Sequence, residues 1–192
     1  MQALLVSTGV VALAEMGDKT QLLAFILGAR FKKPVPIILG ILVATLLNHG
    51  LAGAVGSWVA HNVSAQMLRW ALGASFIAMA VWTLIPDKIE QEEDQIANKL
   101  GVFGATLITF FLAEMGDKTQ IATVALATYY VAPVTVVIGT TLGMLIADVP
   151  AVLLGDRFAK RIPMRLVHGI AAAIFLVLGV LALTGIGATL GI

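Results

Sequence analysis

Two identical stretches of nine residues carry the side chains of this chain that could do chemistry. Leu13–Gln21 and Leu112–Gln120 both read Leu-Ala-Glu-Met-Gly-Asp-Lys-Thr-Gln, and we call them the first and the second motif. Each motif places two carboxylates inside a long apolar run, and these residues are Glu15, Asp18, Glu114 and Asp117. A charged carboxylate at the centre of a bilayer costs roughly 3 kcal/mol, so such residues are normally paired, protonated or functional.

The spacing of the motif residues favours a shared cation site. On a continuous helix Glu15 and Asp18 would lie about 60° apart on one face, with Lys19 close to that face. If the two motif faces meet, four carboxylates and two lysines leave a formal charge of −2, which one divalent cation would balance. Carboxylate oxygens are hard ligands, and they suit calcium, magnesium or manganese better than copper or zinc.

A simpler alternative gives the motifs a structural role only. Glu15 and Lys19, and likewise Glu114 and Lys118, are four residues apart, which is the spacing of ion pairs on one helix. Such pairs could hold helices together beside protonated aspartates. This alternative leaves unexplained why the same costly cluster occurs twice.

Two polar residue types follow the acidic pair in each motif. The side-chain oxygens of Gln21 and Gln120 could complete a metal shell or serve in structural hydrogen bonds, and the sequence leaves both roles open. Thr20 and Thr119 are expected to face away from the carboxylates. Their hydroxyls are expected to bond to a carbonyl of their own helix.

Glycines at two kinds of position are expected to bring helices close together. Gly17 and Gly116, inside the motifs, are expected to let a neighbouring backbone approach. Gly139 and Gly143 are four residues apart in another apolar run. This spacing is typical of closely packed membrane helices.

A fifth carboxylate, Asp148, also lies in an apolar run, and the residue 99 positions before it is His49. Pro150 has no amide hydrogen for the carbonyl of Ile146, so a free carbonyl is expected near Asp148. Asp148 is therefore a candidate cation ligand or part of a proton path. His49 is expected to be a packing histidine with satisfied ring nitrogens, and a proton relay is the alternative.

The composition of the chain places it in a membrane. Of 192 residues, 59% are hydrophobic and only 12% are charged, with a mean hydropathy of +0.99. Soluble domains carry about a quarter charged residues. The absence of cysteine excludes disulfides, thiolate metal sites and thiol catalysis.

Charged and proline-containing breaks divide the chain into six apolar runs, each long enough to span a bilayer. The runs cover residues 2–29, 34–57, 66–86, 100–128, 133–155 and 164–189. The second motif follows the first at an offset of 99 residues. At the same offset Pro34 matches Pro133 and Phe76 matches Phe175, so the two halves are a duplication.

The duplicated halves are expected to have opposite orientations, because three helices are an odd number. We therefore predict an all-α membrane protein with six transmembrane helices in two inverted three-helix repeats. The repeats are residues 1–86 and 100–192, and an acidic linker at 87–99 joins them. In inverted repeats the substrate site lies near mid-membrane where the halves meet.

The basic residues predict how the chain is oriented. The first, third and fifth connections between the runs contain lysine or arginine, and the second and fourth contain none. Basic loops face the cytoplasm, so both termini are predicted outside. The acidic linker is then cytoplasmic, as a solvated connection or, alternatively, as a loop that attracts cations.

The two motifs resemble the Glu-x-Gly-Asp-(Lys/Arg)-(Thr/Ser) signature of the Golgi manganese/calcium–proton antiporter family, which includes bacterial manganese exporters of the MneA type. The resemblance covers the whole chain and implies that divalent cations leave the cytoplasm, with manganese as the usual bacterial substrate. It implies exchange for protons. It also implies that the four motif carboxylates, at Glu15, Asp18, Glu114 and Asp117, bind the ion.

We therefore expect a secondary transporter, without catalytic residues or a resident cofactor, that exports manganese(II) in exchange for protons. A calcium/proton antiporter, a cation channel and an exporter of organic solutes are the alternatives. An intramembrane aspartyl protease also needs two membrane aspartates, but each aspartate here comes with a glutamate and a lysine. The expected metal ligands are Glu15, Asp18, Glu114, Asp117, Gln21, Gln120 and Asp148.

The expected location is the bacterial inner membrane, which the chain crosses several times. The expected partners are divalent metal ions, protons and the lipid bilayer, with no nucleic acid. The two repeats complete one site within one chain, so a monomer is sufficient and a homo-oligomer is not required.

Overall fold

The computed structural model describes residues 1–84, 94–154 and 164–184, and the chain is helical throughout these ranges apart from short connections. The described helices are α1 (Gln2–Glu15), α2 (Lys19–Phe31), α3 (Pro34–Asn62), α4 (Ala65–Thr83), α5 (Asp94–Glu114), α6 (Lys118–Tyr130), α7 (Pro133–Leu154) and α9 (Met164–Thr184). No strand occurs in these ranges, so the predicted all-α class is confirmed. Most of the acidic linker lies outside the described residues.

Two helices, α3 and α7, are each long and apolar enough to cross a membrane. The apolar part of α5 and the following α6 form a third span if they are counted together across their 70° bend. The described chain thus has two or three candidate spans, where the apolar runs predicted six. One reason for the difference is that the expected spans at 2–29 and 100–128 are each divided into two short helices.

Each division falls at a motif. The first helix of each pair ends at the motif glutamate, Glu15 or Glu114, and the second begins at the motif lysine. The expectation that each motif lies on one continuous helix is therefore wrong. Asp18 and Asp117 instead occupy the N-cap positions of α2 and α6, with extended backbone. Neither aspartate side chain makes a capping hydrogen bond, but a negative charge is favourable at a helix N-terminus.

A glycine allows each break. Gly17 and Gly116 have φ values of 82° and 74°, in the left-handed region that side chains other than glycine rarely adopt. A Cβ at Gly116 would meet nothing within 4 Å, so the expected close approach of a neighbouring backbone is wrong there. Each glycine N–H donates a 2.8 Å hydrogen bond to the side-chain oxygen of Gln21 or Gln120 in its own motif.

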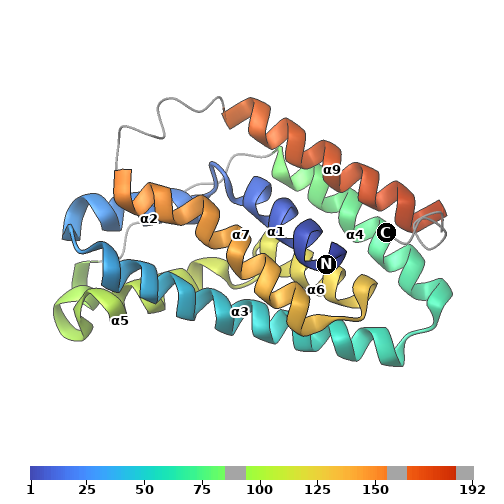
Figure 1. The fold of residues 1–192 in the computed structure, drawn as a ribbon, viewed down its shortest axis with the longest axis horizontal. Helices are drawn as coiled ribbons and strands as arrows, with labels where there is room; N and C mark the ends of the chain where they lie inside the picture. Colours follow the sequence, from blue (N-terminus) through green and yellow to red (C-terminus); the bar gives the residue numbers. More distant parts are fainter. Residues whose placement is uncertain (85–93, 155–163, 185–192) are drawn as a thin grey trace.

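The helices pack mainly against the other half of the chain (Figure 1). α1 lies along α7 and α5 lies along α3, while α2 also contacts α7 and α6 contacts α3. The last helices of the halves, α4 and α9, lie side by side. The long helices α3 and α7 therefore connect the two broken pairs and hold the motifs in place.

Small residues allow these contacts, as the Gly139 and Gly143 spacing predicted. A Cβ at Gly139 of α7 would lie 2.8 Å from the carbonyl oxygen of Leu4 in α1, and one at Gly143 would lie 2.7 Å from that of Thr8. Likewise, a Cβ at Gly40 of α3 would lie 3.1 Å from the carbonyl oxygen of Phe103 in α5. Gly40 is 99 residues before Gly139, and Phe103 is 99 residues after Leu4. The Gly40–Phe103 contact is therefore the equivalent of the Gly139–Leu4 contact in the duplicated chain.

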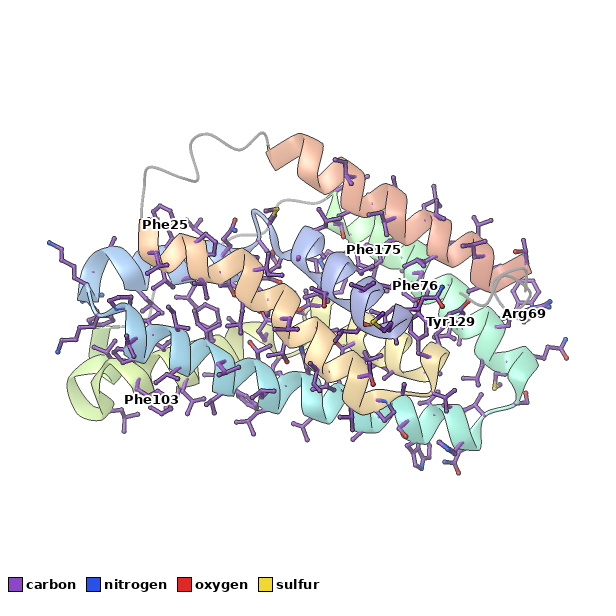
Figure 2. The ribbon with its side chains drawn as sticks, viewed as in Figure 1. Phe25, Arg69, Phe76, Phe103, Tyr129 and Phe175 are labelled. Carbon is purple, nitrogen blue, oxygen red and sulfur yellow. The ribbon has the colours of Figure 1, made fainter. Side chains whose placement is uncertain are left out.

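One aromatic contact joins equivalent residues of the two halves. The buried rings of Phe76 in α4 and Phe175 in α9 stack with their centroids 6.4 Å apart and an angle of 26° between the ring planes. Figure 2 shows both side chains between the two helices. The contact therefore joins equivalent positions of the two halves.

We predict that Gly116→Ala destabilises the protein because alanine must adopt a positive φ at the break. A residue other than glycine in such a conformation costs about 1–3 kcal/mol. The expected result is a lower thermal unfolding midpoint of the purified protein in detergent. Gly50→Ala is the matched control, because Gly50 lies within α3 and its Cβ would meet nothing within 4 Å. Equal midpoints for the two variants would contradict the role of the left-handed conformation.

Candidate metal site

The two motifs face each other inside the bundle. Lys118 Nζ lies 2.8 Å from Asp18 Oδ1, and Lys19 Nζ lies 3.1 Å from Asp117 Oδ1. The helices on either side of the breaks also meet, because α1 contacts α6 and α2 contacts α5. The two breaks thus bring four helix ends and both sets of charged side chains to one place.

The lysines pair across the motifs. Lys19 of the first motif binds the aspartate of the second, and Lys118 of the second binds the aspartate of the first. The alternative of ion pairs one turn apart on a single helix is wrong, since the helix ends between the glutamate and the lysine of each motif. These crossed pairs connect the two halves of the chain through charged groups.

Three carboxylates lie close enough together to hold one metal ion. Glu15, Glu114 and Asp117 each offer one oxygen, and these oxygens lie within 4.8 Å of one another. All three side chains are buried. Among the described residues, neither carboxylate oxygen of Glu15 has a hydrogen-bond partner, and neither does Oε1 of Glu114. Buried polar atoms are nearly always satisfied, so a bound cation or proton is needed to complete this site.

The second motif threonine belongs to the site. Thr119 Oγ1 donates a 2.7 Å hydrogen bond to Oε2 of Glu114. The expectation that this threonine faces away from the carboxylates is therefore wrong. The break explains the difference, because it turns the residues after Gly116 relative to α5. The hydroxyl fixes one oxygen of Glu114 and leaves the other without a partner.

Asp148 lies beside the motif carboxylates. It is completely buried in α7, and neither of its oxygens has a hydrogen-bond partner among the described residues. Its charged neighbours are Glu114 and Asp18, and it also interacts with Glu15. The structure therefore places the predicted fifth carboxylate near three of the four motif carboxylates, Glu15, Asp18 and Glu114.

The two glutamines tie the breaks to the long helices. Their side-chain oxygens accept the glycine N–H bonds described above. Gln21 Nε2 donates to the carbonyl oxygen of Ala147 in α7 at 2.9 Å, and Gln120 Nε2 donates to Asn48 Oδ1 in α3 at 3.4 Å. Asn48 and Ala147 are 99 residues apart, so the two glutamines make equivalent contacts. These bonds give both glutamines a structural role in this arrangement.

His49, the counterpart of Asp148, is also completely buried. Among the described residues, neither ring nitrogen has a hydrogen-bond partner. His49 is thus buried, as expected for a packing histidine, but the expectation that its ring nitrogens are hydrogen-bonded is wrong. The duplicated halves thus differ at this position, with an imidazole on one side and a carboxylate on the other.

The electrostatics of the site favour a cation. Five carboxylates and two lysines carry a formal charge of −3 when all are ionised. The carbonyl oxygens of Glu15 and Glu114, at the ends of α1 and α5, accept the backbone N–H groups of Asp18 and Asp117 at 3.0 and 3.1 Å. The C-terminus of a helix carries partial negative charge, so the ends of α1 and α5 add to the attraction for a cation. Because ligation requires deprotonated carboxylates, the site can hold a hard divalent cation or protons, each excluding the other.

Sequence reasoning missed the breaks and the crossed lysine pairs. The signal for the breaks is present in each motif, since a glycine that can end a helix is followed by an aspartate that can begin one. The crossed pairing has no such local signal, because it depends on how the two halves meet.

Comparison with known proteins agrees with the duplication and with the chemistry of the site. The family model described as "Divalent cation/proton antiporter GDT1" matches the chain twice, over residues 3–91 and 102–188. Together the two matches cover most of the chain, and each contains one motif. No solved structure matches this chain.

Three relatives illustrate the range of similarity. A Vibrio cholerae protein named "Putative manganese exporter" is 49% identical over 93% of this chain and 88% of its own length. The rice protein named "GDT1-like protein 3" is 29% identical over 91% of this chain and 71% of its own length. The Arabidopsis thaliana protein named "Protein PAM71-homolog, chloroplastic" is 25% identical over 92% of this chain and 57% of its own length. The chain belongs to the GDT1 family of divalent cation/proton antiporters.

Proposed function

We propose that this protein exports divalent cations, with manganese(II) as its main substrate, from the cytoplasm in exchange for protons. The observation that carries the proposal is the buried carboxylate cluster shared by the two motifs, in which both oxygens of Glu15 have no hydrogen-bond partner among the described residues. The family description supports proton exchange. The name of the Vibrio cholerae relative supports manganese and the direction of transport.

The transported ion is bound by the motif carboxylates. Glu15, Glu114 and Asp117 provide the first oxygens, since these already lie together. Asp18 and Asp148 lie beside them and supply further negative charge. The glutamine oxygens, at Gln21 and Gln120, have a second lone pair beside the one that accepts the glycine N–H, and this lone pair is available to a metal ion.

Transport follows from competition between metal and protons. When the site is open to the cytoplasm, ionised carboxylates replace the water around the cation. The two halves then move against each other, and protons from outside take the same oxygens and release the ion. The protein needs no resident cofactor for this and acts as a transporter rather than as an enzyme.

The proposed architecture has six spans in two inverted repeats, at residues 1–86 and 100–192, joined by the linker at 87–99. The first and fourth spans are the broken pairs α1–α2 and α5–α6. The double family match, the equivalent glycine contacts and the Phe76–Phe175 pair support this arrangement. The protein lies in the bacterial inner membrane, with the basic connections in the cytoplasm and both termini outside. One chain completes the site, so a monomer is sufficient.

An antiporter that carries calcium is the second candidate, since a site made of oxygens accepts calcium as well as manganese. The complete burial of the carboxylates favours a carrier over a channel. An open pore would expose these groups to water on both sides.

We predict that Asp117→Asn reduces manganese accumulation at least tenfold in inside-out vesicles with an imposed proton gradient. Tenfold corresponds to about 1.4 kcal/mol, which is less than the loss of one charged ligand costs in a site of low dielectric constant. Asp156→Asn, outside both motifs and outside the acidic linker, is the control and is expected to transport normally. Equal accumulation by Asp117→Asn and the unaltered protein would exclude this site.

We predict that manganese binding weakens as the pH falls. Ligation requires deprotonated carboxylates, so protons compete with the metal and the apparent Kd rises toward acidic pH. If one proton is released for each bound ion, the Kd rises about tenfold per pH unit in the range where the site titrates. Titration calorimetry of the purified protein at several pH values measures this slope. A Kd that is independent of pH would contradict exchange for protons at this site.

We predict that the first and second connections lie on opposite sides of the membrane. The chain has no cysteine, so single cysteines can be introduced and labelled one at a time. Asn62→Cys, near the second connection, is expected to react with an impermeant thiol reagent added to intact cells. Lys33→Cys, in the first connection, is expected to react only after the membrane is opened. The reverse pattern would invert the proposed orientation.

A further inference from the structure

We propose that Lys19 and Lys118 are built-in cations that occupy Asp117 and Asp18 in the metal-free carrier and compete with the transported ion. This inference rests on the proposed function and adds two residues that set the affinity of the site. It starts from the crossed ion pairs, which connect each lysine with the aspartate of the other motif.

The geometry makes lysine and metal alternatives at Asp117. Lys19 Nζ lies 3.1 Å from Oδ1 of this carboxylate, and the same residue is one of the three that offer oxygens within 4.8 Å of one another. A divalent ion bound there would place two positive charges close to the ammonium group. Repulsion between charges at such distances is strong where water is excluded, so Lys19 leaves as the ion binds.

The two lysines differ in how easily each can separate from its aspartate. The side chain of Lys19 is 27% exposed, whereas that of Lys118 is 1% exposed and lies 2.8 Å from an equally buried aspartate. Separating a buried pair leaves an uncompensated charge and costs more than separating an exposed one. Lys19 is therefore the lysine that the ion displaces first, and Lys118 remains the stronger competitor.

A competing internal cation is useful to an exchanger. It lowers the affinity for the metal, so that the ion can be released on the other side. It also compensates the aspartates of the empty carrier, which would otherwise bury negative charges without partners. Each lysine thus neutralises its aspartate when no metal ion is bound.

Competition by lysine and structural support by lysine predict opposite changes in metal affinity when the lysine is removed. Removal of a purely structural ion pair weakens the fold and lowers or leaves unchanged the affinity for metal. Removal of a competitor raises the affinity, because the aspartate is then available to the metal. A gain in affinity is a readout that loss of structure does not produce.

The test is manganese binding to the purified full-length protein by titration calorimetry, together with export in reconstituted vesicles. We expect the Kd of Lys118→Gln to fall about tenfold or more and that of Lys19→Gln to fall about threefold, since a partly exposed ion pair is weaker than a buried one. The maximal export rate of Lys118→Gln is expected to fall, because the more tightly held ion leaves more slowly.

Charge-conserving variants are the controls. Lys118→Arg and Lys19→Arg keep one positive charge at each position, on a guanidinium group in place of the ammonium group. Their Kd for manganese is expected to stay close to that of the unaltered protein. Lys33→Gln removes a lysine from an exposed connection and controls for the net charge of the chain. Its Kd is expected to be unchanged.

The outcomes separate this inference from the proposed function. If the unaltered protein binds and exports manganese but neither lysine variant binds it more tightly, competition by lysine is overturned while the function stands. If Lys118→Gln does not fold, the test rests on Lys19, whose side chain is partly exposed, and an unchanged or raised Kd of Lys19→Gln overturns the inference. If the unaltered protein binds no divalent cation, the proposed function fails and this inference fails with it.

Discussion

Negative charge inside an apolar bundle is the constraint on which the rest of this structure depends. The motif carboxylates and Asp148 are completely or almost completely buried, where each ionised group loses its hydration. Three features offset that loss: the lysine of the other motif, the N-terminus of a helix at each aspartate, and a hydroxyl bond to Glu114. Both oxygens of Glu15 still have no hydrogen-bond partner among the described residues, and this deficit is what makes the site receptive to a cation or a proton.

The helix breaks follow from this constraint. A continuous helix at each motif would keep its amide groups in its own hydrogen bonds, and its aspartate would have no helix N-terminus to stabilise it. The positive φ of Gly17 and Gly116 ends one helix and lets the next begin at the aspartate. The glutamines then fix each break to a long helix of the other half, so the position of the site depends on contacts between the halves.

The sequence was sufficient for the helical class and the duplication, and it singled out the carboxylates that the structure brings together. Hydropathy and exact repetition are local properties that a sequence displays directly, and charged residues in apolar runs are conspicuous for the same reason. The breaks were missed because one glycine barely changes the hydropathy of a run of nearly thirty residues. The crossed pairs of Lys19 and Lys118 could not be predicted, because spacing along the chain does not determine which residues of two distant segments meet. The predicted direction of the Thr119 side chain was wrong for a related reason. It assumed the regular rotation of about 100° per residue of a continuous helix, and this rotation is interrupted at the break.

Identical motifs in unequal surroundings are what an exchanging carrier requires. The two motifs have the same nine residues, yet Lys118 is buried while Lys19 is half-buried, and Asp117 but not Asp18 belongs to the group of three close carboxylates. Because the two motifs have the same sequence, each could adopt the environment that the other has in this structure. In the proposed carrier, the two motifs could therefore exchange their environments. A second state with the roles of the motifs exchanged would open the site toward the opposite side. In such a carrier, the difference between His49 and Asp148 would limit this equivalence, because an imidazole and a carboxylate would exchange surroundings, and the two states would then differ in stability.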